Sequence, residues 1–274
     1  MNISVTWLSS YLYCKRKFFL EQVLGMAEPL NEIIVKGKIK HEVYDLANKQ
    51  ERGIVLSIDS ADREFIFGKY KNAYLKNLNN ILLIQKSTLE SLKLSQKELF
   101  EELWPFFQNE ANARTDNIVN FVKKTQLFGK ELWEALQPKI ESEMYIESDN
   151  LGLKGKIDRV EKYQNPDNFI PVELKTGSAP KEGVWEGHLI QVSAYMMLLE
   201  DRFNAKIDTG KVVYLSQGAT RDVKINPFIK DEIKRLVREI NALLAKSEHK
   251  EAPAIAANRN KCDSCGLRKG CFNL

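Results

Sequence analysis

The chain has 274 residues, of which 43% are hydrophobic, and its 41 basic and 37 acidic side chains leave a net charge of only +4. A chain of this size can bury a full core, and so mild a charge does not by itself indicate nucleic acid. Its apolar runs are shorter than the roughly 18 residues of a membrane span and no N-terminal signal segment is recognised, so we expect a cytoplasmic protein without a membrane partner.

Helical spacing dominates the start of the chain. Apolar residues recur at this spacing from Trp7 to Phe19, which places Cys14 on a helix or at its end. A second helix is predicted over about 31–49. Residues 53–58, with their run of β-branched and aliphatic side chains, are predicted to form a short strand.

The stretch 60–137 is rich in Leu, Lys, Glu and Asn and has few Gly or Pro residues. This composition predicts several helices and no strand. It contains no recognisable motif, and its aromatic side chains are assigned to a core rather than to a contact surface. We therefore expect an all-helical insertion.

After Pro138 the sequence changes to short, partly alternating segments separated by turn residues. The predicted elements are strands at 141–147, 151–163 and 169–175, a helix at 184–200, strands at 211–215 and 221–225, and a helix at 227–246. The turns between strands fall at 149–150, 165–168 and 217–218. The first three strands are expected to form a meander.

The four cysteines lie at the two ends of the chain. Cys262 and Cys265 form a C-x2-C pair, Cys271 follows closely, and Cys14 is their only companion. Four sulfurs suit tetrahedral zinc or an iron-sulfur cluster. Disulfides and four unrelated thiols are the competing interpretations. The reducing cytosol argues against disulfides, and the close spacing of three cysteines argues against unrelated thiols.

Basic residues flank these cysteines at both ends of the chain. They are Lys15, Arg16, Lys17, Arg259, Lys261, Arg268 and Lys269. If the cysteines join the two ends, these cations form one patch. Such a patch contacts phosphates or is simply a solvated surface, and the sequence leaves both interpretations open.

Acidic residues and a lysine occur on two successive predicted strands. Asp158 lies on the first, and Glu173 and Lys175 lie on the second. Residues two apart share a face of a strand, so Glu173 and Lys175 point the same way, opposite to Val172 and Leu174. Buried carboxylates are costly unless they bind a metal or pair with cations. The group is therefore a divalent-metal site with Lys175 acting on a water, or a structural ion pair at a sheet edge.

Two helical motifs supply further candidate residues. Gly37 and His41 lie four residues apart on one helix face, and His41 could add an imidazole ligand that favours manganese over magnesium. Gln191 and Tyr195 have the same spacing on the helix over 184–200. They could contact a phosphate, support the carboxylates, or form a buried polar pair.

The motifs follow one another in the order Cys14, Gly37-x3-His41, Gly155-x2-Asp158, Glu173-x-Lys175, Gln191-x3-Tyr195 and Cys262-x2-Cys265-x5-Cys271. This order resembles the RecB-type nucleases of the PD-(D/E)xK superfamily, and among them most the iron-sulfur exonucleases of the CRISPR-associated Cas-four family. The resemblance covers about 1–45 and 138–274 and leaves the helical middle unexplained. The separation of His41 from Asp158 is longer than in compact members.

The resemblance implies an α/β fold, with a restriction-endonuclease-like core sheet flanked by helices, an all-helical insertion and a C-terminal iron-sulfur region. The expected domains are N-terminal helices at 1–59, the insertion at 60–137, the nuclease core at 138–247 and the cluster tail at 248–274.

The resemblance also assigns roles to single residues. The catalytic residues would be Asp158, Glu173 and Lys175. The ligands of Mn²⁺ or Mg²⁺ would be His41, Asp158, Glu173 and the Leu174 carbonyl. Gln191 and Tyr195 would lie beside the DNA. The ligands of a [4Fe-4S] cluster, rather than zinc, would be Cys14, Cys262, Cys265 and Cys271. Glu143, on the preceding strand, lies near this group in the predicted sheet but is left out of it.

The function implied by the resemblance is metal-dependent exonucleolytic hydrolysis of single-stranded DNA or overhangs during CRISPR adaptation, with the Cas-one and Cas-two integrase as partner. One alternative keeps the chemistry but assigns it to DNA repair or replication. Another class of function is a non-catalytic, zinc-stapled DNA-binding module whose acidic residues are structural.

Overall fold

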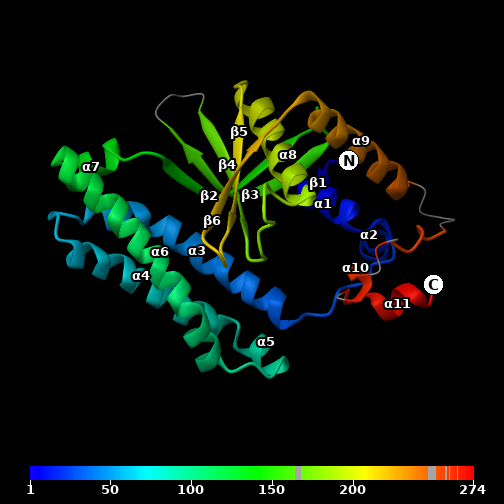
Figure 1. Cartoon of the computed structure of the whole chain (residues 1–274), viewed down its shortest axis with the longest axis horizontal. Helices are drawn as coiled ribbons and strands as arrows, with labels where there is room; N and C mark the ends of the chain where they lie inside the picture. The colour runs from blue at the N-terminus through cyan, green and yellow to red at the C-terminus, as the bar shows by residue number, and fades with distance from the viewer. Residues whose placement is uncertain (164–167, 246–250, 257, 259, 264) are drawn as a thin grey trace. The chain divides into compact units, whose positions relative to one another are not determined.

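The computed structural model of the chain describes residues 1–163, 168–245, 251–256, 258, 260–263 and 265–274 (Figure 1). It divides into two compact units. The sheet unit comprises Met1–Leu30, Glu143–Val160 and Asn165–Leu274, and the helical unit comprises Asn31–Ser142 and Glu161–Gln164.

The strands of the chain form a six-stranded sheet. Its strands are β1 (Ile3–Ser4), β2 (Lys139–Ser148), β3 (Leu153–Lys162), β4 (Phe169–Lys175), β5 (Thr209–Tyr214) and β6 (Ala219–Lys224). They are ordered β1-β3-β4-β5-β6, and β2 also pairs with β3. The predicted succession of three strands over 141–175 is confirmed, as are the two later strands. The predicted turn at 165–168 lies almost entirely outside the described residues.

Strands β4 and β5 run parallel, with Glu173 opposite Val212. Parallel neighbours need a crossover connection, which is provided by α8 (Glu186–Phe203). Gly210 of β5 allows this helix to lie close to the sheet, because a Cβ atom there would fall 2.3 Å from the Val192 side chain. The crossover therefore holds α8 directly over the strand that carries Glu173 and Lys175.

Three helices of the sheet unit pack on one another: α1 (Val5–Tyr13), α8, which lies against the sheet, and α9 (Pro227–Ala245). They lie on the same side of the strands in Figure 1. Helix α8 is apolar almost all round, and such a helix must be covered on several sides. The sheet, α1 and α9 cover it, so side chains on α8 have little freedom to move.

The two ends of the chain pack together in a small second core of the sheet unit. It is formed by α2 (Lys15–Gln22), α11 (Arg268–Phe272) and the residue before α11, and the short α10 (Asn260–Asp263) precedes α11 in the C-terminal segment. Phe19 and Leu20 of α2 are buried against Leu267 and Cys271. Cys14 lies between α1 and α2, at the helix end expected for it.

The helical unit contains α3 (Glu32–Leu56), α4 (Arg63–Ile84), α5 (Lys86–Ser91), α6 (Gln96–Thr125) and α7 (Gly129–Ala135). The all-helical prediction for 60–137 is confirmed. Helix α3 belongs to this unit rather than to the N-terminal helices, because its apolar face packs on α4 and α7.

The strand predicted over 53–58 is wrong, because α3 continues to Leu56. Val55 is fully buried and Ile58 is almost fully buried, and both belong to the helical core. Tertiary packing of this face outweighs the β propensity of the segment. No helix in the described part of the chain has the length and hydropathy of a membrane span.

Candidate active site and cysteine pocket

Asp158 on β3 and the pair Glu173 and Lys175 on β4 occupy neighbouring strands. Glu173 Oε1 lies 2.9 Å from Lys175 Nζ, so the two side chains do share a face as predicted. Asp158 Oδ2 accepts a hydrogen bond of 2.8 Å from the Leu174 N–H. The aspartate is thereby fixed against the strand that carries the other two residues.

Gln191 on α8 connects Glu173 and Lys175 through its amide group. Its Nε2 donates to Glu173 Oε1 at 2.7 Å, and its Oε1 accepts from Lys175 Nζ at 2.9 Å. The Gln191 side chain is buried, as is Glu173. The three groups form a closed hydrogen-bonded triangle, which holds the Lys175 ammonium in one place.

Tyr195 lies one helical turn beyond Gln191 and reaches the other strand. Its hydroxyl donates to the Lys156 carbonyl at 3.0 Å, and the ring is almost fully buried. The ring lies on Gly155, where a Cβ atom would be only 2.7 Å from Tyr195 Cε1. Gln191 therefore ties α8 to β4, and Tyr195 ties α8 to β3.

Burial dominates the electrostatics of Asp158. It raises the pKa of this carboxyl group to about 6, although the Leu174 N–H and the Lys175 charge act in the opposite direction. The nearby Glu143 carboxylate also raises this pKa. Burial therefore disfavours the charged form of Asp158, and a cation bound beside it would stabilise that form.

Glu143 is a site residue that the sequence did not single out with any motif. It forms an ion pair with Lys156 and lies close enough to influence both Asp158 and Tyr195. Its backbone is left-handed, with φ +56°, which is uncommon for a residue other than glycine. This backbone geometry cannot be read from the sequence around Glu143.

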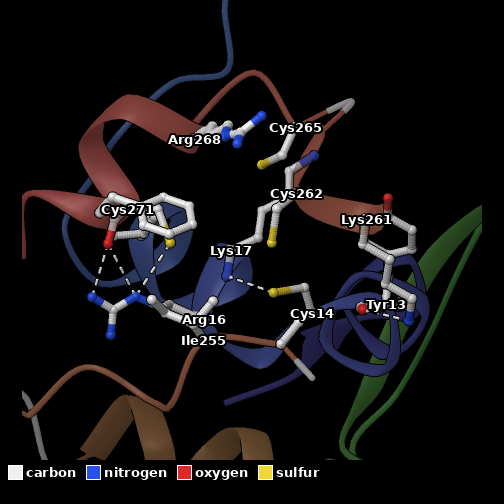
Figure 2. Close-up of a pocket in the computed structure, with 13 residues that line it drawn as sticks. Tyr13, Cys14, Arg16, Lys17, Ile255, Lys261, Cys262, Cys265, Arg268 and Cys271 are labelled. Atoms are coloured by element: carbon white, nitrogen blue, oxygen red, sulfur yellow. Dashed lines mark hydrogen bonds between the residues drawn. The ribbon is translucent and has the colours of Figure 1, made fainter. Parts of the chain in front are cut away.

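All four cysteines line a single pocket in the sheet unit (Figure 2). Each is a free thiol, so none is engaged in a disulfide. Figure 2 shows the four sulfur atoms turned toward the same space, with Cys14 coming from the N-terminal helices and the others from the C-terminal segment. The two chain ends thus meet at their cysteines, as the sequence suggested.

Hydrogen-bond donors surround the sulfur atoms. Arg16 Nε lies 3.2 Å from Cys271 Sγ, and the Lys17 N–H points at Cys14 Sγ over 3.4 Å. Arg16 is buried, and its guanidinium also donates to the carbonyls of Cys271 and Pro253 at 2.9 and 2.8 Å. Burial raises the pKa of the Cys265 thiol, although the Leu267 N–H and the Lys17 charge act in the opposite direction.

The basic residues near the cysteines are largely engaged within the sheet unit. Their partners are Glu239 for Lys15 at 3.1 Å, Glu28 for Lys17 at 2.6 Å and Asp263 for Arg268 at 3.0 Å. Arg16 is buried, and Arg259 lies outside the described residues. Arg16 is therefore internal, whereas Lys15 and Arg268 remain exposed although they are ion-paired, and Lys269 is also exposed.

Comparison with known protein families identifies the fold. The family described as the PD-(D/E)XK nuclease superfamily matches residues 2–272. The chain belongs to this superfamily. The match spans both the sheet unit and the helical unit, including the helical middle that the motifs left unexplained.

Three curated relatives illustrate the range of this nuclease superfamily. A CRISPR-associated exonuclease Cas4/endonuclease Cas1 fusion from Leptospira interrogans is 32% identical over 46% of this chain and 23% of its own length, which supports the Cas-four relationship. The DNA replication ATP-dependent helicase/nuclease dna2 of Schizosaccharomyces pombe is 23% identical over 98% of this chain and 18% of its own length. The human DNA replication ATP-dependent helicase/nuclease DNA2 is 24% identical over 99% of this chain and 26% of its own length. The chain thus spans about a quarter or less of these relatives.

PD-(D/E)XK nucleases use divalent metals, and the oxygen donors of the site suit such an ion. The carboxylates of Asp158 and Glu173 and the Leu174 carbonyl are hard ligands of the kind that Mg²⁺ and Mn²⁺ prefer. His41 is on α3 in the helical unit, so its addition to this set stays a prediction. Among the described residues, no three His, Cys, Asp or Glu side chains are arranged to hold a metal ion, either here or at the cysteines.

A groove opens beside Lys175 in the sheet unit. Its volume is about 630 Å³, and Trp185 and His188 of the α8 start contribute to its wall. His188 Nδ1 lies 3.0 Å from the Tyr214 hydroxyl, and burial, with a contribution from the Lys175 charge, lowers the pKa of its imidazole to about 4. Neither Trp185 nor His188 was singled out by the sequence, although His188 precedes Gln191 by one helical turn.

Proposed function

We propose that this PD-(D/E)XK nuclease is a metal-dependent DNA exonuclease that acts on single-stranded DNA or on single-stranded overhangs. The observation that carries this proposal is the closed triangle of Glu173, Lys175 and Gln191 beside Asp158. A structural ion pair would need only the first two residues. The buried amide adds an orientation for the ammonium group, which is what a catalytic lysine requires.

The chain's own residues have separable tasks in this chemistry. Mn²⁺ or Mg²⁺, when bound, would polarise the scissile phosphate and lower the pKa of an attacking water. Asp158, Glu173 and the Leu174 carbonyl, with His41, would hold the ion. Lys175 would direct its charge at the oxygens on which negative charge develops during in-line attack. No covalent intermediate with the protein is needed.

The second proposed cofactor is a [4Fe-4S] cluster held by Cys14, Cys262, Cys265 and Cys271. Four free thiols in one pocket, with Arg16 beside one sulfur, match the all-cysteine ligand set of such clusters. The same set would accept zinc. The cluster would have a structural role and would join the two chain ends. Its four cysteines line a pocket whose lining includes none of Asp158, Glu173 and Lys175.

Two biological settings follow from different relatives. The Cas4/Cas1 fusion supports a role in CRISPR adaptation, where the protein would trim DNA and associate with the Cas-one and Cas-two integrase. The helicase/nucleases align over 98% and 99% of the chain, whereas the fusion aligns over 46%, and this favours DNA replication or repair as the second candidate. Binding of the purified protein to the integrase separates the two settings.

A DNA-cleavage assay of a Lys175 variant tests the catalytic role proposed for this lysine. Lys175→Ala should abolish Mn²⁺-dependent degradation of single-stranded DNA and leave DNA binding largely intact. Lys224, an exposed residue on the outer strand β6, provides the matched control, and Lys224→Ala should cut normally. If purified Lys175→Ala protein degrades DNA at the wild-type rate, the catalytic assignment is wrong.

Metal analysis of the same protein separates the enzyme from the remaining class of function. Iron-sulfur absorption together with cleavage that requires added divalent metal supports the proposal. A colourless zinc protein without nuclease activity would instead be the zinc-stapled DNA-binding module. Cys265→Ala should lose iron, stability and DNA affinity together, and a soluble, fully active, iron-free variant would contradict the structural role of the cluster.

A further inference from the structure

We propose that Trp185 is a stacking platform for an unpaired base, and that it makes this nuclease selective for single-stranded DNA at the groove beside Lys175. The inference rests on the proposed function and deepens it by naming a specificity-determining residue. The lysine groove is defined by Tyr13, Lys17, Lys175, Trp185, His188 and Lys261, all of which belong to the sheet unit.

The size of the lysine groove fits a nucleotide rather than water alone. Its volume of about 630 Å³ falls within the range of roughly 300–1,000 Å³ found for ligand-binding pockets. Lys175, which the proposed chemistry places at the scissile phosphate, lies in its wall. A nucleotide in this groove would therefore be a neighbour of the phosphodiester that is cut.

Trp185 is held in place by its edge while much of its ring stays exposed. The indole Nε1–H donates to the Ser178 carbonyl at 2.8 Å, and the Trp185 backbone N–H lies 3.4 Å from the Tyr214 hydroxyl. Yet 52% of the residue's surface is accessible to solvent. An exposed tryptophan is costly in surface free energy, and a fixed ring loses little entropy when a ligand stacks on it.

The charge of the lysine groove suits a nucleic-acid backbone. Three lysines line it, Lys17, Lys175 and Lys261, against one acidic side chain, Glu186, among its described lining residues. Lys17 and Lys175 are also ion-paired with Glu28 and Glu173, which lie outside the groove's described lining. Lys261 lies over Tyr13, with its Nζ 4.9 Å from the centre of the ring. Aromatic faces interleaved with cations are the combination by which proteins hold single strands without reading their sequence.

Base pairing determines which DNA can use this platform. Bases inside a duplex already stack on their neighbours, and their faces are covered. A single strand can place one base on Trp185 without any unpairing cost. The groove would thereby favour single-stranded ends over blunt duplexes before any chemistry takes place.

Binding to a short oligothymidine by Lys175→Ala protein, which cannot cut it, provides the first test. Adding Trp185→Ala should weaken this binding about 5- to 150-fold, the range of a lost base–aromatic stack. Trp185→Phe keeps a ring and should recover most of the affinity. Phe228 is 85% exposed on α9 outside the groove, and Phe228→Ala should bind as tightly as its parent.

Abasic substrates test the stack without changing the protein's fold. An abasic nucleotide moved along the oligothymidine should weaken binding sharply at one position when Trp185 is present. The same substitution should have little further effect on Trp185→Ala protein, because the two changes remove the same contact. Binding to blunt duplex should be equal with and without the tryptophan.

The outcomes separate this inference from the proposed function. If wild-type protein cuts DNA with metal but Trp185→Ala binds the oligothymidine unchanged, or if the abasic effect is the same in both proteins, stacking on Trp185 is refuted and the nuclease proposal stands. If the tryptophan effects appear but no metal restores cleavage, the single-strand platform stands and the nuclease proposal fails.

Discussion

Gly155→Ala should destabilise the sheet unit, because Gly155 is the point at which α8 touches β3. The added Cβ atom would lie 2.7 Å from Tyr195 Cε1 and 3.3 Å from two Val5 side-chain atoms. Carbon atoms in contact prefer separations of about 3.5–4.0 Å, so the ring must retreat by about 0.8 Å or more. Tyr195 and Val5 are both almost fully buried, and neither has free space to occupy.

The expected size of this effect comes from two opposing contributions. Alanine restricts the unfolded chain more than glycine and would stabilise a strand by about 0.5–1 kcal/mol if the methyl group fitted. Overpacking a core costs typically about 1–3 kcal/mol. The steric cost therefore exceeds the entropic gain. Because β3 carries Asp158 three residues further on, we also expect nuclease activity to fall.

Urea denaturation of the purified variant measures the free energy of unfolding, and a melting curve should shift by about 2–4 °C per kcal/mol. Gly177→Ala is the control, since a Cβ atom there would have nothing within 4 Å. In a Tyr195→Leu background the cost of Gly155→Ala should shrink, because the clashing atom is gone. A Gly155→Ala protein as stable as the wild type would refute the close contact between α8 and β3.

Two further predictions concern charge. The imidazole of His188 has a pKa of about 4 in the folded protein against 6.5 when unperturbed, so its contribution to stability is complete above pH 6.5 and is lost as the pH falls toward 4. His188→Gln should flatten the pH dependence of urea stability in this window by about 1–2 kcal/mol, allowing for solvent screening of a half-buried group, and an unchanged slope would contradict the shift. Arg16→Gln leaves the buried carbonyls of Pro253 and Cys271 without their donor, at a cost of about 1–3 kcal/mol, so proteases should cut the C-terminal segment faster. Arg16→Lys keeps the positive charge but lacks the planar set of guanidinium donors, so it should restore protease resistance only in part. Protease resistance equal to that of the wild type in both variants would contradict the proposed support of the C-terminal segment by Arg16.

Periodicity in the sequence identifies most of the fold, because the long elements have one buried face. The apolar pattern over 184–200 and the first-turn Pro227 correctly predict α8 and α9. The error at 53–58 arises because short aliphatic runs suit a strand and a buried helix end equally well. Only the packing of Val55 and Ile58 on the helical core distinguishes the two.

The sequence predicts the part of the candidate site whose side-chain directions follow from strand alternation alone. Glu173 and Lys175 must share a face, and they do. The sequence cannot show that Gln191 reaches both of them, because that depends on how close α8 lies to β4. The run Lys15-Arg16-Lys17 suggests three surface cations, but Arg16 is buried beside Cys271. Trp185 gives no signal at all until its exposure is seen.

The residue spacing along helix α8 fixes the relative positions of the side chains that it contributes to the groove and to the triangle. His188, Gln191 and Tyr195 follow one another on α8 at intervals of three or four residues, so these three lie along one stripe of the helix, and Trp185 is the residue at its N-cap. A single inserted residue would turn everything beyond it by about 100°. His188 could then no longer line the groove while Gln191 contacts Glu173 and Lys175. A change of the side chain at Trp185 would alter base stacking alone, whereas a change in the number of residues between Trp185 and Tyr195 would disturb the groove and the triangle together.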